Sequence, residues 1–181
     1  MTQSVPTPDE LVEESLALDL DGLRVEFHAA VGETTDCLVV WLPERRTALV
    51  SNLFGPLFGH VPNLVTIRGD RYRDPLAYVA SLERVLDLAP ERLVTGHFDP
   101  IDGADLIAEE IVAMRDAMEW VHDRTVDGMN AGTDVHTLMR EVRVPEHLDV
   151  GEGYGRTAWN VRAIWEQYGT IGLRRAFGGA L

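Results

Sequence analysis

Two side chains in this sequence are of types that bind a divalent metal, and both stand where a strand is expected to end. Glu33 lies in the segment Gly32-Glu33-Thr34, where a glycine lets the backbone turn and the carboxylate can point off the edge of a sheet. His97 follows the short apolar run Leu93-Val94. Zinc takes a carboxylate and an imidazole as ligands, usually within a set of three or four protein groups. The sequence therefore predicts part of a metal site whose other ligands are unassigned.

Ordinary structural roles are the alternatives for both residues. One Glu and one His that could meet are common in proteins, so Glu33 could be a surface carboxylate and His97 a histidine that caps a strand end. A ligand pair of one Glu and one His also does not determine which metal binds, because it suits zinc, manganese or iron almost equally.

Composition places the chain among ordinary globular proteins. Its 181 residues are 45% hydrophobic and 25% charged, which fits one domain with a sizeable core. The formal net charge of -14 argues against binding nucleic acid or an anionic membrane. No apolar run approaches the roughly 20 residues of a membrane span. We expect a cytoplasmic protein with a flexible arm at residues 1–8 and a single domain at residues 9–181.

The elements that must position the two side chains can be read from the spacing of apolar residues. Alternation from Leu23 predicts a strand, and residues 36–42 and 47–50 predict a hairpin with a charged turn at 43–46. Residues 92–95 predict a further short strand. Helices are predicted over residues 75–89, 104–121, 135–142 and 157–168, and the second of them carries an apolar seam made by Ile107, Ile111, Met114, Met118 and Val121.

Some segments are less regular. The run Leu38 to Leu42 is continuously apolar, which predicts a strand buried on both faces. Residues 9–16 fit either a short helix or an extended edge segment. Residues 53–70 contain too many glycines and prolines for a regular element and are long for a plain connector, so we expect a loop with a function. Strands followed by covering helices indicate an α/β or α+β fold.

Several motifs, taken in order, resemble a known family. They are Gly32-Glu33-Thr34-Thr35-Asp36, Val39-Val40-Trp41-Leu42-Pro43, Pro62-Asn63-Leu64-Val65-Thr66-Ile67-Arg68-Gly69 and Thr95-Gly96-His97. Their order and spacing resemble the second half of a metallo-β-lactamase-fold hydrolase, in particular the alkyl sulfatases, from about Leu18 to Tyr168. The resemblance implies an α/β fold that is half of a metallo-β-lactamase-type αββα sandwich, with a β-hairpin and strands followed by covering helices.

The resemblance also implies roles for individual residues. Glu33 and His97 match metal ligands of a site that holds one or two zinc ions, and Asn52 stands at the position of the bridging acidic ligand. Asn63 and Arg68 match residues near the anionic sulfate group of the substrate. A guanidinium suits that place because it presents paired donors to a tetrahedral oxyanion.

Two departures from the family pattern shape the functional hypothesis. The family's early His-x-His-x-Asp-His cluster, which supplies most zinc ligands, has no counterpart in this sequence. Asn52 offers only a neutral amide oxygen, which is a poor bridge between two cations. The hypothesis is that a companion chain carrying the N-terminal half of the fold supplies the missing ligands, and that the two chains hydrolyse a small ester, sulfate esters included.

Two other hypotheses remain open. The chain could be a non-catalytic structural or regulatory partner of a metallo-β-lactamase-fold enzyme, which Asn52 favours. It could also be a homo-oligomer that holds one metal through Glu33, His97 and water, but two protein ligands seldom bind zinc tightly.

Overall fold

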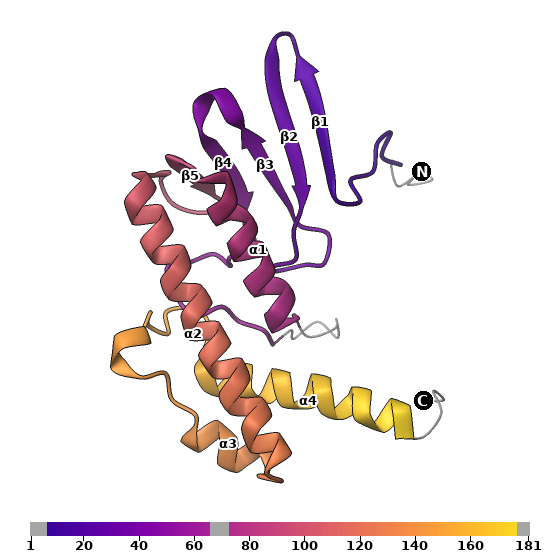
Figure 1. The fold of residues 1–181 in the computed structure, drawn as a ribbon, viewed down its shortest axis with the longest axis vertical. Helices are drawn as coiled ribbons and strands as arrows, with labels where there is room; N and C mark the ends of the chain where they lie inside the picture. The colour runs from indigo at the N-terminus through magenta and orange to yellow at the C-terminus, as the bar shows by residue number, and fades with distance from the viewer. Residues whose placement is uncertain (1–6, 66–72, 177–181) are drawn as a thin grey trace, which may run out of the picture.

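The computed structural model describes residues 7–65 and 73–176, with side chains up to residue 169. Arg68 lies outside the described residues, as do residues 1–6 of the predicted arm. The described residues form an α/β structure in which one mixed sheet is followed by helices (Figure 1).

Within the described ranges, six strands form one sheet in the order β1-β2-β3-β4-β5-β6. They are β1 (Ser15–Leu20), β2 (Leu23–Ala29), β3 (Leu38–Leu42), β4 (Thr47–Ser51), β5 (Arg92–Thr95) and β6 (Ile101–Asp102). Neighbours are antiparallel except β4 and β5, which are parallel. A parallel pair needs a crossover connection, and helix α1 (Pro75–Leu88) lies in it.

The first hairpin resolves the open question about residues 9–16. The end of that segment is extended and begins β1, while residues 9–14 form no regular element. Asp21 and Gly22 connect β1 to β2 with φ angles of 53° and 85°. Positive φ at both central residues is typical of the two-residue hairpin turns whose twist matches the flanking strands.

The predicted β3–β4 hairpin is confirmed, but the burial predicted for β3 is wrong. A short 3-10 turn, η1 (Pro43–Arg45), connects the two strands. Val39 and Trp41 are buried, whereas Leu38, Val40 and Leu42 are only half-buried. The reason is that the helices pack on one face of the sheet, so every second side chain of β3 faces away from them.

The predicted helices are present, and a side-chain cap explains where α1 begins. Asp74 caps α1 by accepting hydrogen bonds from the backbone N–H groups of Leu76 and Ala77, both at 2.9 Å, and Pro75 fills the first turn. Helix α2 (Ala104–Asn130) is longer than predicted, and all five residues of its predicted seam are buried. The seam packs α2 against α1 and against helix α4 (Thr157–Ala176).

The last third of the chain is helical and extends beyond the sheet (Figure 1). Helix α3 (Val135–Glu141), the 3-10 turn η2 (Glu146–Leu148) and helix α4 (Thr157–Ala176) follow α2. The predicted helix at 157–168 therefore begins where expected and runs further. In Figure 1, α4 crosses α2 below the sheet, and α3 packs against α4.

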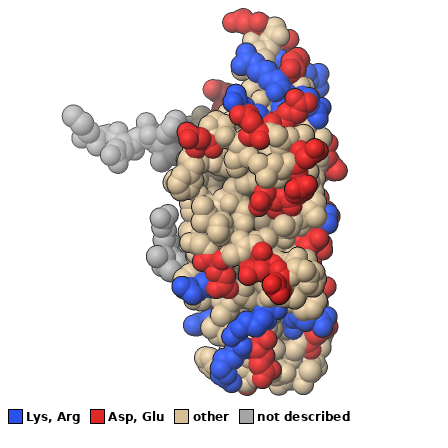
Figure 2. Space-filling model, turned by 90° about the vertical axis from the view of Figure 1, so that its left-hand side faces the viewer, with Lys and Arg blue, Asp and Glu red and all other residues tan. Residues whose placement is uncertain are grey.

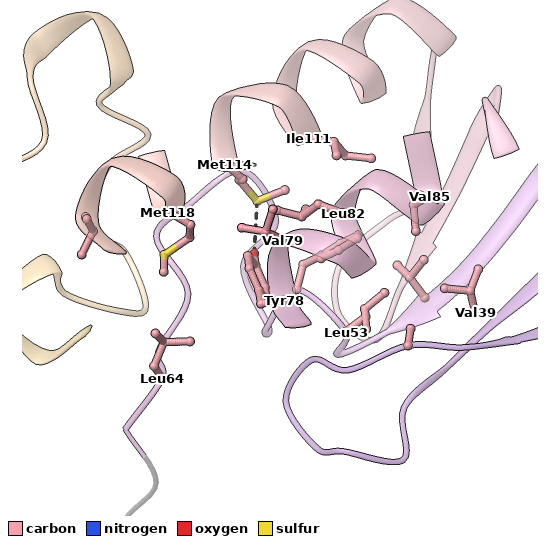
Figure 3. Close-up of a cluster of buried hydrophobic side chains, with 14 of the residues drawn as sticks. Val39, Leu53, Leu64, Tyr78, Val79, Leu82, Val85, Ile111, Met114 and Met118 are labelled. Atoms are coloured by element: carbon pink, nitrogen blue, oxygen red, sulfur yellow. Dashed lines mark hydrogen bonds between the residues drawn. The ribbon is translucent and has the colours of Figure 1, made fainter. Parts of the chain in front are cut away.

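One continuous core joins these parts. Figure 3 shows side chains of the sheet, α1, α2 and the loop after β4 in contact, with Tyr78 of α1 directed at Met114 of α2. The Tyr78 hydroxyl lies 3.8 Å from the Met114 sulfur. Burial raises the pKa of Tyr78, so this hydroxyl stays protonated at all ordinary pH values.

The face of the sheet that turns away from the helices carries a row of apolar side chains. Direct pairing across β1 to β5 aligns Leu16, Phe27, Val40, Leu49 and Val94. Directly paired residues point to the same face, and all five are half-buried. No described helix covers them (Figure 1).

Charge is unevenly distributed over the surface. On the face shown in Figure 2, basic side chains lie mainly toward the two ends, acidic ones are spread along most of the length, and an uncharged area lies left of the middle. In the part of the chain that the model describes, no helix has the length and apolar character needed to cross a membrane.

Candidate active site at the sheet edge

The candidate site lies at one edge of the sheet, where three strands end. Strands β2, β4 and β5 run in the same direction because β3 is antiparallel to both of its neighbours and β5 is parallel to β4. The loops that carry Glu33, Asn52 and His97 therefore leave the sheet at the same edge. This agrees with the expectation that the two candidate ligands stand at strand ends.

Glu33 follows a glycine that is packed tightly against the loop after β4. A Cβ on Gly32 would collide with the backbone carbonyl oxygen of Leu53, so only glycine fits there. The backbone N–H of Val31, the residue before Gly32, donates to the Ser81 hydroxyl of α1 at 2.8 Å. These contacts fix where Glu33 leaves the sheet.

The Glu33 carboxylate is held by an arginine and a tyrosine. Arg73 donates from Nη2 to Oε1 at 3.1 Å and from Nε to the Glu33 backbone carbonyl at 2.8 Å. The Tyr154 hydroxyl donates to the same Oε1 at 3.3 Å. The Arg73 and Glu33 side chains are 16% and 25% exposed, so their attraction is only partly screened by solvent. Both described hydrogen bonds to the carboxylate end on Oε1.

Asn52 and His97 are neighbours at the ends of β4 and β5. The backbone N–H of Gly96 donates to the Ser51 carbonyl at 2.9 Å, and the Asn52 side-chain oxygen lies directly against Gly96. His97 itself is exposed, and the next residue, Phe98, has a φ of 64° and is 82% exposed. The His97 side chain is thus accessible to solvent just past the end of β5, and it does not line the pocket beside Glu33.

Asn63 shapes the loop that borders the site. Its side-chain oxygen accepts a hydrogen bond from the Val65 N–H at 3.0 Å, and its backbone carbonyl accepts one from the Arg73 guanidinium. The role of Asn63 in substrate binding stays a prediction. Arg68, its predicted companion, lies outside the described residues.

The loop before α4 closes the site from the other side. Gly55, with a φ of 83°, lets the Tyr154 ring approach its Cα closely. Together with Glu33, Arg73 and Asn63, these residues line a narrow pocket of about 10 Å³, on the order of one water molecule. His60 does not point into it, because its Nδ1 accepts a hydrogen bond from the Gly153 N–H at 3.2 Å.

The donor set fits the zinc that the fold implies only in part. Glu33 and His97 are of the right chemical types, and Asn52 is a weak neutral donor. In the described ranges, no three His, Cys, Asp or Glu side chains come together as metal ligands. The residues fit one side of a zinc site and fall short of the three protein ligands that catalytic zinc takes.

Sequence reasoning missed Arg73 and Tyr154. They are 40 and 121 positions from Glu33, and no local pattern relates them. For Tyr154, the available signal was the spacing Gly151-Glu152-Gly153-Tyr154-Gly155, because alternate glycines indicate close backbone approach.

Comparisons with known proteins identify the relatives of this chain. A linear primary-alkylsulfatase from Pseudomonas sp. is 32% identical over 167 residues, which cover 89% of this chain and 31% of that enzyme. The solved structure of a stereoselective inverting sec-alkylsulfatase from Pseudomonas sp. matches with a TM-score of 0.77 and 25% identity, covering 96% of this chain and 31% of that one. No family model matches the chain.

A third comparison bears on the fold alone. A metallo-beta-lactamase family protein from Thermus thermophilus matches with a TM-score of 0.58 and 18% identity, covering 92% of this chain and 51% of that one. The predicted fold is therefore confirmed. The chain is homologous to alkylsulfatases of the metallo-β-lactamase fold and spans about a third of the length of the relatives it matches.

Proposed function

We propose that this chain is one subunit of a two-chain, metal-dependent hydrolase of the metallo-β-lactamase fold that acts on a small ester. Glu33 and His97 are its contribution to a shared metal site, with Asn52 beside them. A companion chain supplies the His-x-His-x-Asp-His ligands that this sequence lacks. Sulfate esters are the first substrates to test, because the relatives named above are alkylsulfatases.

The observation that carries the proposal is the pairing of an incomplete donor set with an uncovered apolar sheet face. Two donors suited to zinc stand at the edge where β2 and β5 end, and the described residues bring no third. The row Leu16 to Val94 crosses the same sheet without a covering layer. Apolar area of this kind normally marks an interaction site, and a second sheet packed there would bring further ligands to the same edge.

The metal would act when bound as a Lewis acid that lowers the pKa of a water molecule. This chain's own part is to present a carboxylate and an imidazole at fixed positions. The small pocket beside Glu33 has room for about one water molecule.

The test is co-expression of this chain with a candidate companion that carries the His-x-His-x-Asp-His cluster, followed by native mass spectrometry and elemental analysis. We expect a hetero-oligomer that contains zinc, manganese or iron, and loss of most of that metal in Glu33→Gln and in His97→Ala. Glu109→Gln and His147→Ala are matched controls, because both side chains are exposed and lie elsewhere. A well-folded complex without metal would overturn the proposal.

A second candidate keeps the fold without the chemistry. The chain would be a structural or regulatory partner of a catalytic homologue, with Glu33 as an internal ion-pair partner of Arg73. Asn52 favours this reading because a neutral amide stands where the family places a bridging acid. In that case Glu33→Gln and His97→Ala would leave the activity of the complex unchanged.

A further inference from the structure

Arg73 reaches three oxygen atoms from two loops. Its Nε and Nη2 donate to the carbonyl and the carboxylate of Glu33, and its Nη1 donates to the carbonyl of Asn63. The backbone N–H of Arg73 also donates to the Leu64 carbonyl at 3.1 Å. A planar guanidinium can serve three acceptors in fixed directions, whereas an ammonium is a point charge without that geometry.

Tyr154 approaches the same carboxylate from the loop between α3 and α4. The Gly155 N–H donates to the Val61 carbonyl at 3.0 Å, and the Val61 N–H donates to the Gly151 carbonyl at 3.1 Å. A Cβ on Gly155 would collide with the Pro62 carbonyl. This close pairing of two loops sets the position from which the Tyr154 hydroxyl meets Glu33.

Helix α4 contacts both the segment that holds Arg73 and the loop that carries Tyr154. Asn160, which is fully buried on α4, accepts from the Leu64 N–H and donates to the Pro62 carbonyl. The Thr157 N–H at the start of α4 donates to the Glu152 carboxylate at 2.8 Å. The helix thus fixes the 62–64 segment that holds Arg73 and the 149–155 loop that holds Tyr154.

We infer that Arg73 and Tyr154 are positioning residues for the Glu33 carboxylate. They hold Oε1 by hydrogen bonds, and Oε2 is then the oxygen that faces a ligand. The purpose of this positioning rests on the proposed function, but the hydrogen bonds that orient Glu33 do not depend on a metal. Helix α4 and the loop before it would then set the orientation of the Glu33 carboxylate at the edge of the sheet.

The experiment measures the orientation of Glu33 itself. The full chain, labelled with ¹³C at glutamate, is studied by NMR, and three-bond couplings about the Glu33 side-chain torsions report whether one rotamer is populated. We expect one rotamer in the wild type and averaged couplings in Tyr154→Phe and in Arg73→Lys. Arg92→Lys is the matched control, since Arg92 pairs with Asp102 at the opposite end of β5 from the site.

The variants separate positioning from a merely structural role. Arg73→Lys keeps the charge and loses the three-pronged geometry, so a simple charge pair would leave the couplings unchanged. Tyr154→Phe removes only a hydroxyl and keeps the ring packed on Gly55, so the test survives if the arginine variant fails to fold. Unchanged Glu33 couplings in Tyr154→Phe would overturn the inference, whether or not Arg73→Lys folds.

Failure of the proposed function would show differently. With Mn²⁺ added as a paramagnetic probe to the complex of both chains, broadening at Glu33 tests whether this carboxylate is a ligand. Absence of broadening would count against the proposed function. Loss of the single Glu33 rotamer in Arg73→Lys and in Tyr154→Phe would still support Arg73 and Tyr154 as positioning residues.

Discussion

Asn160 offers the strongest test of how this chain holds its site loop. The side chain is 0% exposed. Its Oδ1 accepts from the Leu64 N–H at 3.0 Å, and its Nδ2 donates to the Pro62 carbonyl at 2.8 Å. The two backbone groups belong to a loop with no regular structure, so Asn160 does for them what a neighbouring strand would do in a sheet. Asn160→Ala removes both partners at once.

The expected cost follows from those two groups. A buried polar group left without a partner costs roughly 1–3 kcal/mol, so two give about 2–6 kcal/mol. Water entering the space left by the amide would recover part of that. We therefore expect Asn160→Ala to lower the free energy of unfolding by about 3 kcal/mol.

Urea unfolding followed by tryptophan fluorescence measures this difference. Asn160→Asp should also be destabilising, because it keeps the acceptor, loses the donor to Pro62 and brings a charge into the core. Asn130→Ala is the matched control, since Asn130 is exposed at the end of α2, and its effect should stay within about 0.5 kcal/mol. A loss below about 1 kcal/mol for Asn160→Ala would refute the argument that these two hydrogen bonds fix the loop.

Three further predictions concern other parts of the chain. Gly155→Ala should destabilise by about 1–3 kcal/mol in the same urea assay, because its Cβ would meet the Pro62 carbonyl, and a neutral result would mean that the two loops are not closely paired. Hydrogen bonds from the Thr137 hydroxyl and backbone N–H lower the pKa of Asp134. The stability that Asp134 adds at the start of α3 is therefore present above the ordinary pKa of aspartate and lost as the pH falls through the lower folded value. The gap in melting temperature between wild type and Asp134→Ala should shrink over that range, and a constant gap would contradict it. Val40→Glu on the uncovered sheet face should abolish capture of the companion chain while the melting temperature stays within a few degrees, whereas Leu106→Glu on α2 should leave capture intact.

Local sequence signals were sufficient for most of the elements. Alternating apolar residues predicted β2, and Pro75 with the apolar stripe that follows predicted α1, because each signal reflects the period of the element it builds. The same signals fell short for β1. Its residues are mostly exposed, so the strand exists through pairing with β2 across the Asp21-Gly22 turn.

The burial of β3 shows a different limit. A continuous apolar run from Leu38 to Leu42 cannot say how many layers cover it. The described helices lie on one face of the sheet, which leaves Val40 and its paired neighbours half-buried. No local pattern along the chain encodes whether a second layer covers these side chains.

Local sequence was sufficient to predict the candidate donors, because Glu33 and His97 follow strands and strand ends can be recognised locally. How Glu33 is held depends on the tertiary structure. Arg73 and Tyr154 reach its carboxylate from 40 and 121 positions away. Such contacts arise when α4 and the loop before it pack against the site loop, and packing depends on the shapes of distant segments together, which the spacing of residues along the chain does not encode.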